Sequence, residues 1–165
     1  MSEAVADYIL PPTLVGHADV ARLIREVEFA DNELQAQKVR GEKTGAHLPV
    51  MSQTLSDFLE ANKIDASDGP ALRELKTRLQ QLKDHAPVIH MTFAVAADPE
   101  SLQQLAAWLR QEVHPQALVT AGLQPALVAG VYMRTPNQVH DFTIRAQLAG
   151  KRDIITSELE RLNAG

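Results

Sequence analysis

Histidine, serine and glycine are the residues of this chain whose spacing would reveal a catalytic or metal-binding site. A helical metal site needs two ligands four residues apart on one helix face, and no two of the histidines have that spacing. The serines are few, none lies in a Gly-x-Ser-x-Gly motif, and no glycine-rich phosphate loop is present. The histidines are His17, His47, His85, His90, His114 and His140. We interpret them as packed or solvent-facing side chains.

Two small groupings of ionisable residues remain as candidates. His90 and His140 both fall in expected strands and could be neighbours in a sheet. Arg134, His140 and Asp141 are the clustered residues that a small enzyme would use, provided that a cleft perturbs their pKa values. Asp141 and Arg145 are four residues apart at an expected strand-to-helix junction. We interpret Asp141 as a structural cap or surface partner, and the sequence predicts no catalytic residue, no cofactor and no metal ligand.

The distribution of charge bears on the class of partner. The net charge is −5, with 10 basic and 14 acidic residues before Pro87 and 6 basic and 7 acidic residues from Pro87 onward. A nucleic-acid binder normally needs a basic stripe that displaces counterions, and neither half is basic. The distribution of charge therefore predicts no nucleic-acid partner.

Length and composition limit the architecture. A chain of 165 residues is long enough for one domain or two very small ones. The absence of cysteine excludes disulfides and thiolate metal sites, and it suits a reducing compartment. The first residues lack a signal-peptide pattern, and no apolar run approaches the roughly 20 residues that span a bilayer. We expect membrane association only through a partner.

Helical patterns fill the first part of the chain, and we expect a helical domain over residues 1–86. A first helix is expected to begin near His17 to Asp19 and to end at Gly41, with Asp19 as a plausible N-cap. Pro49 opens a second helix, and Asp68 caps a third whose leucines follow a heptad-like spacing that favours a core seam. The apolar residues of the first helix that we name as candidates for partner binding are Val20, Leu23, Ile24 and Val27.

Alternating strand and helix patterns fill residues 87–165. Their order predicts a small β-α-β-β-β-α domain, so that the fold class is α+β with the helices first. The first strand is nearly continuously apolar, which is typical of a strand buried on both faces. The expected strands span 88–95, 117–123, 128–134 and 138–143.

The last expected helix carries an apolar stripe with coiled-coil-like spacing. It follows after the sheet is complete, so the stripe exceeds what a small sheet needs for cover. We therefore predict that a partner helix binds it. Beyond Ile144, at the start of this helix, the stripe consists of Leu148, Ile155, Leu159 and Leu162.

The segments 127–134 and 141–148 carry a resemblance to a known family. They resemble the C-terminal signature of the delta subunit of F-type ATP synthases, whose mitochondrial counterpart is the oligomycin-sensitivity-conferring protein. Gly130 matches the second glycine of that signature and Asp141 its aspartate, whereas Ala129 replaces the first glycine. The resemblance spans about residues 87–162. At Gly130 we expect a backbone that tolerates a Cβ poorly, through a positive φ or close packing.

The resemblance implies a non-catalytic peripheral-stalk subunit on the cytoplasmic face of the cell membrane. Its partners would be the catalytic head subunits and the stalk helix of an ATP synthase, and it would reach the membrane only through them. The family usually has a six-helix bundle at its N-terminal end, whereas this chain has room for about three helices, so that docking surface does not carry over. The alternative is a small α+β binding module for RNA or a regulatory protein, which would need a basic or aromatic face in a chain with 4% aromatic residues.

Overall fold

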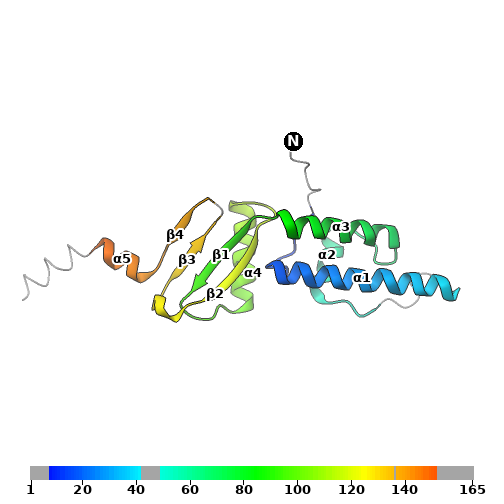
Figure 1. Ribbon diagram of the computed structural model, residues 1–165, viewed down its shortest axis with the longest axis horizontal. Helices are drawn as coiled ribbons and strands as arrows, with labels where there is room; N and C mark the ends of the chain where they lie inside the picture. The colour runs from blue at the N-terminus through cyan, green and yellow to red at the C-terminus, as the bar shows by residue number, and fades with distance from the viewer. Residues whose placement is uncertain (1–7, 42–48, 136, 152–165) are drawn as a thin grey trace, which may run out of the picture. The chain divides into compact units, whose positions relative to one another are not determined.

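The computed structural model describes residues 8–41, 49–135 and 137–151, and it has the predicted α+β fold with three helices before a four-stranded sheet (Figure 1). The chain divides into two compact units. The helical unit comprises the described residues of Met1–Val88 and Pro99–Val119, and the sheet unit those of Ile89–Asp98 and Thr120–Gly165. The predicted division into residues 1–86 and 87–165 stays a prediction.

The elements follow the predicted order, with one short 3-10 helix added. The helices are α1 (His17–Arg40), α2 (Gln53–Ala61), α3 (Gly69–His85), α4 (Pro99–Glu112), the 3-10 helix η1 (Pro125–Leu127) and α5 (Ile144–Gly150). The strands are β1 (Val88–Phe93), β2 (Leu118–Leu123), β3 (Val131–Arg134) and β4 (Val139–Asp141). None of the helices in the described part of the chain is long and apolar enough to cross a membrane.

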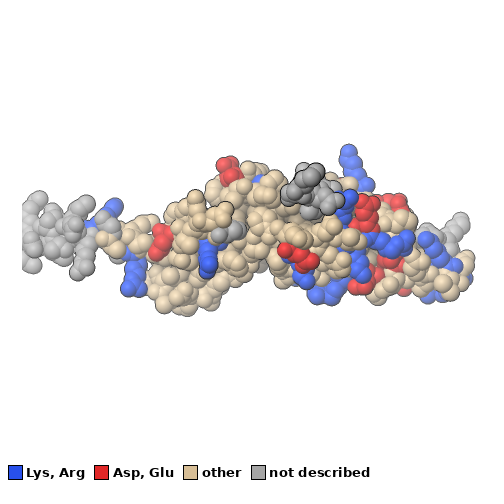
Figure 2. Space-filling view, turned by 45° about the horizontal axis from the view of Figure 1, so that its top comes forward, with Lys and Arg blue, Asp and Glu red and all other residues tan. Residues whose placement is uncertain are grey.

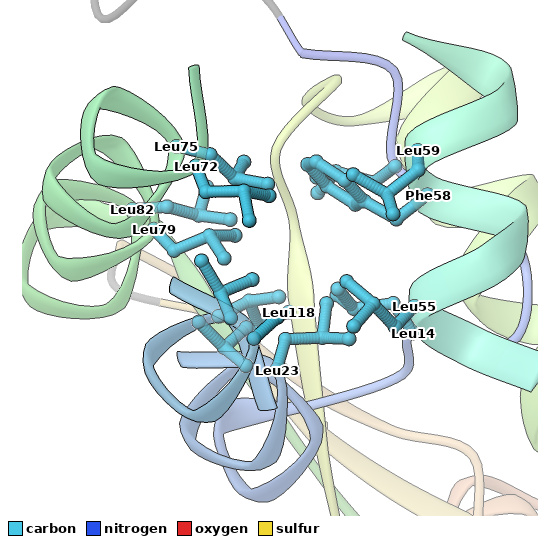
Figure 3. Packing of buried hydrophobic residues seen from close by; sticks show 14 of the residues in the cluster. Leu14, Leu23, Leu55, Phe58, Leu59, Leu72, Leu75, Leu79, Leu82 and Leu118 are labelled. Atoms are coloured by element: carbon cyan, nitrogen blue, oxygen red, sulfur yellow. The ribbon is translucent and has the colours of Figure 1, made fainter. Parts of the chain in front are cut away.

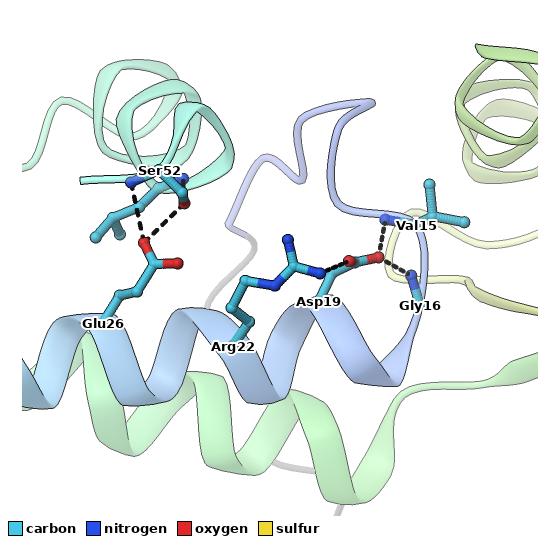
Figure 4. A network of polar contacts seen from close by, with 7 residues as sticks. Val15, Gly16, Asp19, Arg22, Glu26 and Ser52 are labelled. Atoms are coloured by element: carbon cyan, nitrogen blue, oxygen red, sulfur yellow. Dashed lines mark hydrogen bonds and ion pairs between the residues drawn. The ribbon is translucent and has the colours of Figure 1, made fainter. Parts of the chain in front are cut away.

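Local side-chain chemistry sets both ends of α1. Its N-cap is Gly16, and Asp19 lies in the first turn, where its carboxylate accepts the N–H groups of Val15 at 3.1 Å and Gly16 at 3.0 Å (Figure 4). Asp19 therefore satisfies free donors from inside the helix, and is not itself the N-cap that we expected. Gly41 ends the helix with φ 73°, a left-handed conformation that glycine adopts without steric cost.

The next two helices also begin at polar caps. The Ser52 hydroxyl accepts the Leu55 N–H at 3.2 Å, so α2 begins beyond Pro49, where the sequence had placed it. Asp68 caps α3 as predicted, with its carboxylate accepting the Ala71 N–H at 3.4 Å. The buried faces of both helices belong to the same core as that of α1.

One apolar core holds the helical unit together (Figure 3). The leucines of α3 that follow the heptad-like spacing are buried in it, together with Phe58 of α2, which is fully buried. Burying each such side chain contributes about 1.5–3 kcal/mol. The α3 leucines are Leu72, Leu75, Leu79 and Leu82. They form a core seam, as the sequence favours.

A buried arginine connects α4 with the segment before α1. The Arg110 guanidinium donates to the carbonyl oxygens of Ala117 at 3.2 Å, Pro11 at 3.0 Å and Leu14. Burial lowers the Arg110 pKa to about 10, although the nearby Asp19 carboxylate favours the charged form. Three carbonyl acceptors compensate the desolvation of this cation. Sequence reasoning did not find this role, because Arg110 follows an apolar helix face like an ordinary surface residue.

The sheet has the strand order β2-β1-β3-β4 and is mixed. The β1–β3 and β3–β4 pairs are antiparallel. The Leu118 N–H donates to Pro87 at 3.0 Å and the Gln124 N–H donates to Phe93 at 2.8 Å. From the first bond to the second, the residue number increases in both strands, so β1 and β2 run parallel. This is the arrangement expected for a β-α-β crossover.

Two details of the predicted sheet are wrong. Strand β1 is not buried on both faces, because Ile89 and Met91 are buried while His90 between them is exposed. Strand β3 begins at Val131 and not near residue 128, because positive φ values at Val128 and Gly130 keep the preceding backbone out of the extended region. The sheet is therefore smaller than the strand-like runs suggest.

Candidate partner-binding surface

The ionisable candidates do not gather into a catalytic arrangement. Strand β3 separates His90 from His140, which pair with Arg134 and Met133 respectively. The His140 ring lies 3.1 Å from the Gln138 side-chain oxygen and stacks on Phe142 at a centroid distance of 5.8 Å. Within residues 8–41, 49–135 and 137–151, no group of three or more His, Asp or Glu side chains could hold a metal ion.

Gly130 has both features that the sequence predicts. Its φ is 98°, and a Cβ at this position would come within 2.7 Å of the Thr143 Cα. The backbone here is tied to the start of α5, since the Ile144 N–H donates to Ala129 at 3.1 Å. A side chain at Gly130 would therefore push β3 away from the base of α5.

Asp141 fixes the same junction from the other side. Its carboxylate accepts the Thr143 N–H at 3.0 Å, and the Thr143 hydroxyl in turn accepts the Ala146 N–H at 3.2 Å inside α5. Hydrogen bonds from the hydroxyl and the N–H of Thr143 lower the pKa of Asp141 below its ordinary value of 3.8. Asp141 is thus engaged in starting the helix, in agreement with the structural interpretation of this residue.

The backbone just before Gly130 is strained. Val128 has φ 65° and ψ −56°, and the Ala129 N–H donates to the Leu127 carbonyl at 2.7 Å, so these three residues form a γ-turn. A positive φ is rare for a β-branched residue and costs on the order of 1–3 kcal/mol. The Val128 side chain is nevertheless 81% exposed. The strained turn therefore carries an apolar side chain that is exposed to solvent.

Exposed apolar side chains collect at this end of the sheet, where β1 and β2 end and β3 begins. Figure 2 shows few charged side chains over the sheet unit on the face that it presents. Backbone hydrogen bonds bring the segments together, because Gln124 pairs with Phe93 and Phe142 pairs with Val131. We call the set the apolar tip, and it consists of Val95, Leu123, Val128, Phe142 and Ile144. Several exposed apolar residues at one end of a sheet are candidates for an interaction site.

The residues predicted to bind partners differ in burial and in whether the structure describes them. Val20, Leu23 and Val27 are fully buried, and Ile24 packs against the same core, so their apolar surface is used within the helical unit. Leu148 lies on α5, but its side chain is outside the described part of the chain. Three residues of the stripe, Ile155, Leu159 and Leu162, lie outside the described residues altogether. The role of all these residues in partner binding stays a prediction.

Sequence reasoning missed most of the apolar tip. Val128 was assigned to a strand, although the nearby Pro125 and Gly130 are signals of an interrupted backbone. Phe142 replaces a residue that is usually glycine in the resembling signature, and that replacement is the signal that would have found it. No protein-family model matches this chain, and no curated protein is significantly similar to it.

Proposed function

We propose that this chain is a non-catalytic peripheral-stalk subunit of a rotary F-type ATP synthase. The observation that carries the proposal is the placement of Gly130 and Asp141 next to Thr143 at the base of α5. These two positions match the family's C-terminal signature, and each has a defined structural task here. The order of the strands and helices after Pro87 supports the same proposal.

A stalk subunit must transmit torque without turning, and its contacts are therefore broad and apolar. Apolar contact contributes about 25 cal/mol per Å² removed from water. In the proposed complex, the apolar tip and the stripe of Leu148, Ile155, Leu159 and Leu162 face the stalk's long helix. The helical unit then contacts the catalytic head, and the chain lies at the cytoplasmic face of the membrane, attached through these partners.

Co-purification from native membranes tests the proposal. A tagged chain should bring down the catalytic head subunits and the stalk helix of an ATP synthase. The variant with Ile155→Asp and Leu159→Asp should lose the stalk helix while its circular dichroism spectrum stays unchanged. Val39→Asp with Val113→Asp is the matched control, because both side chains are exposed in the helical unit. Recovery of no synthase subunit with the unaltered chain would overturn the proposal.

A further inference from the structure

A second apolar feature lies on the helical unit, on the face of α1 turned away from its core. It is a hollow of about 180 Å³, bounded by α1 and by the extended residues just before α2. Phe29 is 61% exposed here, and Val50 opposite it is fully exposed. The lining residues are Arg22, Arg25, Glu26, Phe29, Pro49, Val50 and Met51. An exposed aromatic ring beside an exposed valine is costly to leave in water unless something covers both.

A pair of hydrogen bonds fixes the width of this hollow (Figure 4). The Glu26 carboxylate accepts the Ser52 N–H at 3.2 Å and the Ser52 hydroxyl at 2.7 Å. Ser52 is also the N-cap of α2, so the extended residues before it are held against α1. The hollow is therefore a preformed feature of the packing between the two helices.

The side chains that line the hollow carry two positive charges, from Arg22 and Arg25, and one negative charge, from Glu26, which favours an acidic ligand. The Glu26 carboxylate keeps its negative charge but is engaged by two hydrogen bonds from Ser52, and Arg22 lies 3.5 Å from Asp19. Arg25 is exposed on the same face of α1, and it has no ion-pair partner among the described residues. A guanidinium in this position is ready to bind a carboxylate in a two-pronged geometry.

We propose that this hollow binds a short peptide segment of a partner protein that carries an apolar side chain next to a carboxylate. A volume of about 180 Å³ is below the usual range for small-molecule sites, about 300–1,000 Å³, and suits one or two anchoring side chains. In the bound state the apolar anchor lies between Phe29 and Val50, and the carboxylate pairs with Arg25. This inference goes beyond the stalk role and does not depend on it.

Selection from a displayed library of random peptides of about twelve residues tests the proposal. Peptides enriched on the unaltered chain should combine apolar and acidic residues within one helical turn. They should bind the Phe29→Ser variant at least about tenfold more weakly, a loss of about 1.4 kcal/mol. Val39→Ser is the matched control, because Val39 is an exposed apolar residue of the same helix outside the hollow.

Reversing the charges of Arg25 and of its peptide partner distinguishes specific binding at this site from nonspecific apolar binding. Arg25→Glu should weaken the enriched peptides, and changing their acidic residue to lysine should restore binding to that variant. The proposal is overturned if no peptide is enriched, if the enriched peptides are basic, or if they bind Phe29→Ser as well as the unaltered chain. Both substituted side chains are exposed, so a folded variant is expected, and circular dichroism verifies it.

Discussion

The helical unit and the sheet unit use their apolar residues in opposite ways. In the helical unit, leucines from three helices and Leu118 form one continuous core. Among the described residues of the sheet unit, the buried apolar residues are Ile89, Met91 and Ala94, whereas Val128 is 81% exposed on a strained turn. A domain with so few buried side chains gains little stability from its own packing. The difference is what we expect if, as we propose, a partner completes the sheet unit.

Charged residues add to the contacts within the helical unit. Two ion pairs join α1 to α3, Glu28 with Lys76 at 2.7 Å and Asp31 with Arg73 at 3.1 Å. Each pair is partly exposed, so each contributes at most about 1 kcal/mol, and their main effect is on the pairing of the two helices. The helical unit is thus specified by both apolar and polar contacts.

Truncating one aromatic residue in each unit should give the largest difference. Phe58→Ala removes a fully buried ring and should lower the free energy of unfolding by about 3–5 kcal/mol. Phe142→Ala removes a ring that is 54% exposed and should cost less than about 1 kcal/mol. Urea denaturation followed by circular dichroism measures both. Equal losses would show that the two units do not differ in the way we describe.

Gly130→Val tests how tightly the base of α5 is built. The left-handed backbone and the contact with Thr143 leave no room for a branched side chain, so the substitution should destabilise the protein by about 1–3 kcal/mol. Gly122→Val is the matched control, since a Cβ there meets no atom closer than 3.6 Å and the backbone φ is not positive. An unchanged denaturation midpoint for Gly130→Val would contradict the claim that this position excludes a side chain.

Val128→Gly should separate stability from binding. Glycine adopts a positive φ without steric cost, so relief of the turn should stabilise the isolated chain by up to about 1 kcal/mol. The same change removes an apolar contact from the tip, so partner capture should weaken. Thermal denaturation and a pull-down on one preparation measure the two effects. A variant that loses stability, or gains it without losing partner capture, contradicts a binding role for this side chain.

The smallest effect concerns two matched aspartates, one in each unit. Asp65 accepts hydrogen bonds from the Ser67 N–H at 2.8 Å and hydroxyl at 2.7 Å, much as Asp141 accepts them from Thr143. These bonds lower the pKa of both carboxyls below 3.8. Because the folded-state pKa is the lower one, each carboxylate stabilises the fold above its unfolded-state pKa. That contribution is lost as the pH falls through the folded-state value.

Carboxyl-carbon NMR titration measures the pKa values of Asp65 and Asp141, and both aspartates should titrate below pH 3.8. Asp141→Asn should then make the base of α5 insensitive to acid in this range. If Asp141 titrates at or above its ordinary value, its carboxylate does not hold Thr143 at the start of α5 in solution.

Local chemistry explains which parts of the fold could be predicted. The leucine spacing of α3 and the Asp68 cap each depend on a few neighbouring residues, and each is visible in the sequence. The glycine requirement at residue 130 was predicted from the family resemblance, because the atoms that exclude a Cβ there belong to Phe142 and Thr143. The burial of Arg110 could not be predicted, because its acceptors Pro11 and Leu14 come from a distant segment. The apolar tip was missed for a similar reason, since it depends on backbone pairing between strands far apart in the chain.

Hydrogen exchange of the free chain and of the co-purified complex tests the central claim most directly. Amides of residues 127–147 should exchange readily in the free chain, because few buried contacts protect them. In the complex, their exchange should slow by at least about tenfold, equivalent to about 1.4 kcal/mol of added protection. The core amides of α3 should be protected in both states. Identical exchange of residues 127–147 in the free and bound chain would contradict the claim that the sheet unit is completed by a partner.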